Sequence, residues 1–393
     1  MAAFPVRDGM GRQVKASGPL AGLKVVEMAG SGPAPFCAML LSDSGADVVR
    51  IERGPGGVRR AAIETAIERG RRSVALDLKA AAGVEACLGL IEVADVLIEG
   101  YRPGVMERLG LGPDVALARN PRLVYGRMTG WGQAGPLAQA AGHDPNYLAL
   151  TGALNAIGPP ERPVLPLNIL GDFGGGGLYL AFGILSALLH ARATGQGQVV
   201  DAAIVDGVLS LMTSLYGAFA AGEVSGERAG SGAYEARHFS NVYRCADGQF
   251  VTVCAYEPQF YAELLKRTGA CADPEFARQH DPCHWPSLKA KLAAIFATRT
   301  RDEWCVIMEG SDACFAPVLS MAEVPRHPHN LARRAFIEVE GVRLPAPAPR
   351  YTRTPSAVQA SSPAARQQET LADWGFSLAR IEALVAAGAL RQP

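Results

Sequence analysis

Leu23-Lys24-Val25-Val26-Glu27-Met28 opens the segment that decides the fold of this 393-residue chain. This apolar run leads into a glycine turn, Gly30-Ser31-Gly32-Pro33, and then into a helical pattern over residues 35–41. A second strand-like run, Asp47-Val48-Val49-Arg50-Ile51-Glu52, follows. Strand, glycine turn, helix and strand in this order predict a βαβ unit of the nucleotide-binding type. The dinucleotide fingerprint is incomplete because Pro35 stands at the third glycine position, so the segment indicates NAD only weakly.

Further strands and helices alternate after this unit. Residues 73–78, 95–99 and 123–128 have strand patterns, residues 80–91 have a helical pattern, and residues 198–201 are typical of a short edge strand. Alternation of this kind predicts an α/β domain with a mostly parallel, Rossmann-like sheet and helices on both faces.

A second, smaller α+β domain is predicted after a glycine- and charge-rich linker. Its first sign is a hairpin with the turn Asp247-Gly248, and helices are expected at Pro258–Thr268, Trp285–Ala297 and after the capping-box pair Thr300 and Glu303. We therefore expect a large domain at 1–205, a linker helix and loop at 206–230, a small domain at 231–330, and a C-terminal segment at 331–393.

Composition limits the partners of this chain. Lys plus Arg equal Asp plus Glu at 38 each, so no net charge attracts the chain to nucleic acid or to a membrane surface. The eight cysteines have no C-x-x-C spacing, which is typical of reduced thiols and predicts no zinc site.

The longest apolar run, Leu178–Leu189, is too short to cross a bilayer and is expected to be a buried helix. Neither terminus carries a targeting signal, so the cytoplasm is the expected location.

Two proton-transfer residues lie in unusual surroundings. His143 stands between Gly142 and Asp144, and Asp172 precedes four consecutive glycines, Gly174–Gly177, that lead into the apolar helix. This pattern predicts a carboxylate at the start of a helix. Because the glycines have no side chains, backbone N–H groups there are predicted to face a ligand. Two alternatives stay open on composition alone: the glycines form a flexible turn, or His143 and Asp172 are ordinary helix caps.

Arginines follow several of the predicted strands. They are Arg53, then Arg69, Arg71 and Arg72, and then Arg102 and Arg108. Since ligands bind beyond the carboxyl ends of parallel strands, this pattern favours a phosphate-bearing ligand. A solvated surface with salt bridges is the alternative interpretation.

Together these motifs resemble the class III CoA-transferase (CaiB/BaiF) family, and within it the α-methylacyl-CoA racemases. The blocks that carry the resemblance include residues 45–52, Glu99-Gly100-Tyr101-Arg102-Pro103, Thr129-Gly130-Trp131-Gly132, Gly142-His143-Asp144, Gly171-Asp172-Phe173 and Glu257-Pro258-Gln259-Phe260. The resemblance spans nearly the whole chain and implies an interlocked homodimer that binds coenzyme A as part of its substrate, with no metal and no redox cofactor.

The resemblance also assigns roles to residues. His143 and Asp172 correspond to the two acid/base groups, and Glu257 corresponds to the residue that orients the histidine, across the dimer interface. Contacts to acyl-CoA are expected from Arg53, Leu76, Asp77, Leu78, Lys79, Gly100, Tyr101, Arg102, Arg108, Gly142, Asp144, Asn146 and Tyr147.

The reaction implied is inversion of the α-carbon of 2-methyl-branched acyl-CoA thioesters by two-base proton transfer. The alternative is a CoA-transferase that moves CoA between carboxylic acids through an anhydride on Asp172. The family's ordinary transferases usually lack a histidine at position 143, which favours the racemase. A non-catalytic acyl-CoA-binding protein is a third possibility, disfavoured by the complete set of His143, Asp172 and Glu257. Pro145 and residues 238–243 depart from the racemase pattern and leave the acyl group open.

Overall fold

The computed structural model describes residues 6–7, 13–14, 17–52, 66–228, 236–361 and 366–391. These residues form two compact units. The first contains residues 1–151, 166–211 and 336–393, and the second contains residues 152–165 and 212–335. The C-terminal segment therefore packs in the same unit as the N-terminal half of the chain.

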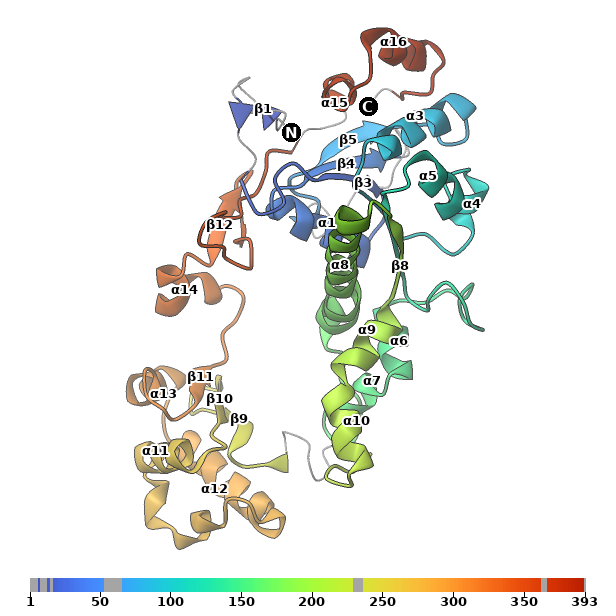
Figure 1. Ribbon diagram of the computed structural model, residues 1–393. Coiled ribbons are helices and arrows are strands. Elements are labelled where there is room, and N and C mark those ends of the chain that lie inside the picture. Colours follow the sequence, from blue (N-terminus) through green and yellow to red (C-terminus); the bar gives the residue numbers. More distant parts are fainter. Residues whose placement is uncertain are drawn as a thin grey trace. The chain divides into compact units, whose positions relative to one another are not determined.

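The first unit is built on a six-stranded parallel sheet, as the α/β alternation predicted (Figure 1). The strand order is β5-β4-β3-β6-β7-β8. Its members are β3 (Lys24–Met28), β4 (Asp47–Glu52), β5 (Arg72–Ala75), β6 (Val96–Glu99), β7 (Val124–Thr129) and β8 (Gln198–Ala203). Val25 of β3 pairs with Val48 of β4 on one side and Val96 of β6 on the other. The strand order reverses between β3 and β6, so the loops after these two strands diverge and leave a crevice.

Helices cover both faces of this sheet. On β7, Tyr125 packs in the core that also holds Leu90 of α3 (Ala81–Glu92) and Ile381 of α16 (Leu378–Ala386). A side chain on the next residue, Gly126, would meet Leu180 and Ile184 of α8 (Tyr179–Thr194). Successive strand residues point to opposite faces, so α8 lies on the face opposite α3 and α16.

The remaining elements of the first unit are helices and two separate pairs of strands, one pair near each end of the chain. They are β1 (Val6–Arg7), β2 (Gln13–Val14), α1 (Pro33–Asp43), α4 (Val105–Arg108), α5 (Pro113–Arg119), α6 (Asp144–Leu150), η1 (Leu167–Ile169), η2 (Leu170–Leu178), α9 (Ile204–Leu211), β12 (Phe336–Val339), β13 (Val342–Pro345) and α15 (Gln367–Asp373).

The glycine run does not form a turn. Residues 170–178 form a π-helix, η2, which follows η1 and continues directly into α8, so Gly174–Gly177 lie inside one long helix. The expectation that the glycines leave N–H groups free for a ligand is therefore wrong. A side chain on Gly175 would lie 2.5 Å from Val208 of α9, and one on Gly177 would lie 2.7 Å from Phe36 of α1. The glycines allow two helices to approach the backbone of η2.

The helix that contains this run is longer than the apolar pattern indicated. Residues 167–194 form a continuous helical segment that is long and apolar enough to cross a membrane by length and composition, with 44% of its most apolar window buried. One side packs on β7, β8 and α1. On the other side Phe182 and Leu189 are each 70% exposed, so the expected burial of this helix holds for one of its faces.

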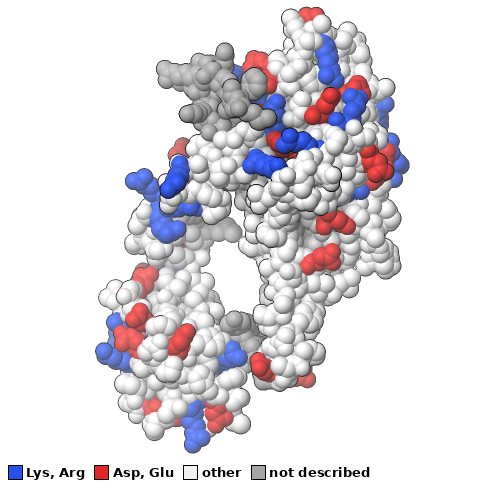
Figure 2. Space-filling model, viewed as in Figure 1, with Lys and Arg blue, Asp and Glu red and all other residues white. Residues whose placement is uncertain are grey.

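Three of the arginines that were predicted to follow strands are structural, and one of them, Arg72, begins β5. Arg69 pairs with Asp43 at 2.5 Å, Arg71 with Glu27 at 3.1 Å, and Arg72 with Asp47 at 2.6 Å. Salt bridges thus account for these three side chains, as the alternative interpretation held. On the face shown in Figure 2, cationic and anionic side chains of the described residues are interspersed, in agreement with the balanced composition.

The second unit contains a three-stranded antiparallel sheet in the order β11-β10-β9. The predicted hairpin forms between β9 (Ser240–Arg244) and β10 (Phe250–Cys254), and Thr300 and Glu303 form the predicted capping box. The other elements of this unit are α7 (Ala153–Ala156), α10 (Thr213–Ala220), α11 (Pro258–Thr268), η4 (Ala270–Ala272), η5 (Pro274–Arg278), η6 (Pro282–His284), α12 (Trp285–Phe296), α13 (Arg301–Met308), β11 (Phe315–Pro317), η7 (Val324–Arg326) and α14 (Pro328–Ala332).

Candidate active site

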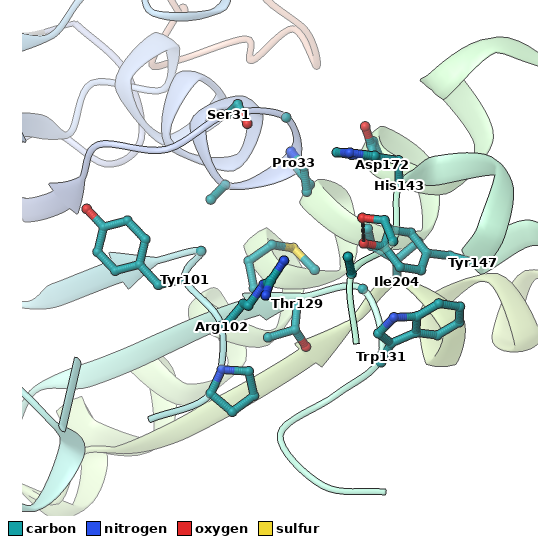
Figure 3. A pocket seen from close by; sticks show the side chains of 18 of the residues that line it. Ser31, Pro33, Tyr101, Arg102, Thr129, Trp131, His143, Tyr147, Asp172 and Ile204 are labelled. Carbon is teal, nitrogen blue, oxygen red and sulfur yellow. Dashed lines mark hydrogen bonds between the residues drawn. The ribbon is translucent and has the colours of Figure 1, made fainter. Parts of the chain in front are cut away.

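A cavity of about 310 Å³ opens in the first unit where the strand order reverses. Its walls come from the loop after β3 with the start of α1, the loop after β6, the end of β7, the segment before α6, and η2. In Figure 3 the labelled side chains of His143 and Asp172 lie at one end of the cavity and the ring of Tyr101 lies at the other. The fold therefore brings the two predicted proton-transfer residues into one site.

The start of α1 forms the wall next to Asp172. Gly32 precedes this helix with φ 73°, a conformation that favours glycine, and a side chain at Gly32 would lie 3.5 Å from Oδ2 of Asp172. Pro33 and Pro35 lack N–H groups, so the first turn of α1 has fewer donors than a dinucleotide-binding helix offers a pyrophosphate. The two prolines at the start of α1 therefore agree with the incomplete dinucleotide-binding fingerprint of the sequence.

His143 occupies the N-cap position of α6 and is exposed. Its backbone N–H donates to Oδ1 of Asn146 at 3.0 Å, so the Asn146 amide anchors the main chain of the histidine. Behind it, the Tyr147 hydroxyl donates to the carbonyl oxygen of Gly142, and the Tyr147 ring packs edge-on against Trp131 with ring centroids 4.7 Å apart. Two aromatic rings therefore hold the loop that presents the imidazole.

Asp172 is half-buried in the first turn of η2. Burial is the main cause that raises its pKa to about 6, and the charge of Asp144 raises this pKa further. A hydrogen bond from Asn168 and the proximity of His143 act in the opposite direction. With a pKa close to neutral, Asp172 is suited both to accept and to donate a proton.

Asp144 does not occupy the cap position of α6, which belongs to His143. It is the first residue of α6, and its Oδ1 accepts the backbone N–H of Asp172 at 2.7 Å. Asp172 is not an N-cap either, because the cap position of η2 belongs to Ile169.

The predicted acyl-CoA contacts divide into two groups. Gly100, Tyr101, Arg102, Gly142 and Tyr147 line the cavity. Others lie outside its walls: Leu76 is buried in the core under the C-terminal segment, Asp77 pairs with Arg391 at 2.6 Å, and Leu78, Lys79, Arg108, Asp144 and Asn146 are not among the lining residues. Arg53 lies outside the described residues.

Glu257 belongs to the second unit. It is exposed and precedes α11 as its N-cap residue. The described residues that line the cavity belong to the first unit, and among them are two of the predicted catalytic residues, His143 and Asp172.

The prediction from sequence missed several cavity residues. Ser31–Pro33, Thr129, Trp131 and Ile204 line the cavity, and Asn168 donates to Asp172. The reversal of strand order could have identified the loop after β3, since ligands bind at such points. Among the described residues, no group of three His, Cys, Asp or Glu side chains is placed to hold a metal ion.

Comparison with known proteins identifies the family. A model of CoA-transferase family III matches residues 20–369. The chain is 44% identical to α-methylacyl-CoA racemase of Mus musculus over 365 residues, which cover 91% of this chain and 94% of the mouse protein. It is 45% identical to the protein of the same name from Homo sapiens over 342 residues, covering 86% and 87% of the two chains. The fold resembles that of a CaiB/BaiF family protein from Brucella suis with a TM-score of 0.78 at 27% identity, covering 91% of this chain and 100% of that one. The chain belongs to CoA-transferase family III, as its sequence motifs predicted.

Proposed function

We propose that this protein is an acyl-CoA racemase that inverts the α-carbon of 2-methyl-branched acyl-CoA thioesters. The mouse and human relatives carry the name α-methylacyl-CoA racemase. The observation that carries the proposal is the presence of two acid/base groups, His143 and Asp172, in one cavity. Inversion of a carbon centre needs a base on one face and an acid on the other, and these two residue types provide them near neutral pH.

The proposed mechanism moves one proton off the α-carbon and one proton onto it. For one enantiomer Asp172 removes the α-proton, the electron pair shifts to the thioester oxygen as an enolate, and the imidazolium of His143 returns a proton to the opposite face. For the other enantiomer the roles are exchanged. Since Asp172 has a pKa of about 6, its carboxylate is a stronger base than an ordinary aspartate while its protonated form stays accessible.

Coenzyme A is proposed to bind through Arg102 at the cavity, with Arg53 and Arg108 as further phosphate contacts. Arg102 follows β6 and lines the cavity, and its side chain lies between the ring of Tyr101 and that of Trp131 in Figure 3. Arg108 ends the short helix α4, and the residue is exposed. Arginine is suited to phosphate because its guanidinium forms paired charge-assisted hydrogen bonds.

The working enzyme is proposed to be a homodimer in which Glu257 of the partner subunit orients His143. Two observations support this. His143 and Glu257 are both exposed in the single chain. Large apolar side chains are also exposed along helices of the first unit, including Phe182 and Leu189 of α8 and Leu211 of α9. Contiguous exposed apolar side chains of this size are typical of an interface. Sedimentation of a fully active monomer would contradict the dimer.

The test of the function is proton NMR of each pure enantiomer of a 2-methylacyl-CoA with enzyme in deuterium oxide. We expect loss of the α-proton signal and formation of the opposite enantiomer without any added carboxylic acid. A transferase would instead require an acceptor acid and would leave the α-proton in place. Retention of the α-proton together with CoA transfer would replace the racemase by the anhydride mechanism at Asp172.

A further inference from the structure

Asp144 lies directly against the backbone of Asp172. Its Oδ1 accepts the Asp172 N–H at 2.7 Å, and the Asp144 residue is 7% exposed. A side chain on Gly171 would lie 2.2 Å from the same oxygen, which explains why glycine precedes Asp172. The fold therefore places the buried carboxylate of Asp144 in contact with the backbone of Asp172, whose side chain is a proposed catalytic group.

Burial raises the pKa of the Asp144 carboxyl group, and two hydrogen bonds from the backbone oppose that effect. Its hydrogen bonds come from the backbone N–H groups of Gly171 and Asp172, and among the described residues no Lys or Arg pairs with it. An asparagine in this place would accept the same N–H without the cost of burying a charge. Two backbone N–H donors account for an anchoring role of this side chain, and the same contact places the Asp144 carboxyl group beside the peptide that carries the Asp172 carboxyl group.

We propose that Asp144 is a positioning residue for Asp172, and that its negative charge favours the protonated form of the Asp172 carboxyl group. The inference rests on the proposed racemase function, in which Asp172 must both take up and release a proton. A nearby carboxylate makes ionisation of Asp172 less favourable, so Asp172 becomes a stronger base when ionised and holds its proton at higher pH.

Among the groups around Asp172, Asp144 is the neighbouring carboxylate whose charge raises the pKa of Asp172. Burial is the largest cause that raises the pKa of Asp172, the charge of Asp144 is next, and Asn168 and His143 lower it. Arg102 and Tyr147 line the same cavity. The parts of α1 and α9 that contact the glycines of η2 are apolar, and Asp206 of α9 is exposed. The apolar contacts are Pro33, Phe36, Ile204, Val208 and Leu211.

The test compares Asp144→Asn with Asp144→Ala in the full-length enzyme. The asparagine variant keeps an oxygen for the Asp172 N–H and removes the charge, whereas alanine removes both. The readout is the pH profile of kcat/KM for α-proton exchange in deuterium oxide. It is measured on the enantiomer from which Asp172 removes the proton, which is the one that His143→Ala is expected to exchange still. For Asp144→Asn we expect the acidic limb to move to lower pH by about one unit. For Asp144→Ala we expect a loss of kcat as well, because Asp172 also loses its anchor.

Two further measurements separate the possible failures. Asn168→Ala removes a hydrogen bond that lowers the pKa of Asp172, so its acidic limb should move to higher pH. Carbon-13 NMR of labelled aspartate in the unsubstituted enzyme, assigned with Asp172→Asn, should show that Asp172 titrates together with Asp144 in two coupled steps. An unshifted limb in Asp144→Asn, or an Asp172 resonance that titrates in one independent step, would overturn the role of Asp144. Failure of the unsubstituted enzyme to exchange any α-proton would instead overturn the racemase function, and the carbon-13 titration would still decide the role of Asp144.

Discussion

Phe36 of α1 stacks on Phe173 of the π-helix, with ring centroids 4.5 Å apart and an interplanar angle of 25°. Phe173 follows Asp172, so this stack fixes the turn of η2 that carries the carboxylate. The stack of Phe36 on Phe173 can form because the glycines of η2 have no side chains that would keep α1 away. A side chain on Gly177 would lie 2.7 Å from Cδ1 of Phe36 and 2.8 Å from the carbonyl oxygen of Pro33.

Gly177→Ala should therefore destabilise the protein despite the higher helix propensity of alanine. The added methyl group meets backbone as well as an aromatic ring, and overpacking of this kind costs about 1–3 kcal/mol. Chemical denaturation should show a lower free energy of unfolding, and kcat should fall because Asp172 moves with η2. The control is Gly217→Ala in α10, where an added methyl group meets no described atom within 4 Å. A Gly177→Ala protein as stable as the control would contradict the packing role of the glycines.

This glycine-rich helix shows where prediction from the sequence failed. Local patterns located β4 at Asp47–Glu52 and α11 at Pro258–Thr268 with the bounds that the structure has, because apolar periodicity and caps are local signals. Glycine lowers helix propensity, so four in a row were predicted to form the start of a helix with free N–H groups, with a flexible turn as the alternative. Packing against α1 and α9 overrides that propensity, and the partners of such packing are distant in sequence.

The candidate site was likewise only partly predictable. His143 and Asp172 could be identified from their residue types, their glycine neighbours and the family resemblance. Their shared cavity depends on the reversal of strand order between β3 and β6, which the order of elements in the sequence leaves open. The bond between Asp144 and Asp172 joins residues 28 apart, and Asn168 reaches Asp172 only because η1 precedes the π-helix. No local signal indicates either contact.

Asp172→Asn should stabilise the protein near neutral pH. The carboxyl group has an ordinary pKa of 3.8 in the unfolded chain and about 6 in the folded protein. The folded protein therefore binds the proton more tightly, so folding stability decreases as pH rises from the lower value through the higher one. Asparagine does not titrate, so the gain in free energy of unfolding should be larger at about pH 7.5 than at about pH 4, by on the order of 1 kcal/mol for this half-buried group. A gain that is the same at both pH values would show that the pKa of Asp172 is ordinary.

Arg102→Ala should weaken binding of acyl-CoA without altering the fold. A charge-assisted hydrogen bond to phosphate contributes about 1.5–3 kcal/mol, which corresponds to roughly a tenfold to hundredfold increase in Kd. Arg108→Ala should have a similar effect, and isothermal titration calorimetry would measure both. Arg72→Ala is the control, because Arg72 pairs with Asp47 at 2.6 Å and with Asp373 at 2.8 Å, and its loss should lower stability while affinity stays unchanged. Unchanged affinity in both Arg102→Ala and Arg108→Ala would place the CoA phosphates elsewhere.

The strongest prediction separates the two proton-transfer residues by the enantiomer on which each acts. If His143 and Asp172 face opposite sides of the α-carbon, each removes the proton from one enantiomer only. His143→Ala should then abolish racemisation in both directions, since one face has lost its acid or base. Asp172 should still exchange the α-proton of one enantiomer, slowly and with retention of configuration.

Asp172→Ala should give the complementary result, with His143 exchanging only the other enantiomer. The measurement is deuterium incorporation into each pure enantiomer by each variant, with chiral analysis of the product and a parallel assay for CoA transfer to a free acid. A transferase predicts a different pattern, because its nucleophilic aspartate is indispensable while His143 contributes at most to positioning. Racemisation that persists in His143→Ala would contradict two-base catalysis. CoA transfer that disappears only in Asp172→Ala would assign Asp172 to an anhydride mechanism, and the cavity would then belong to a transferase.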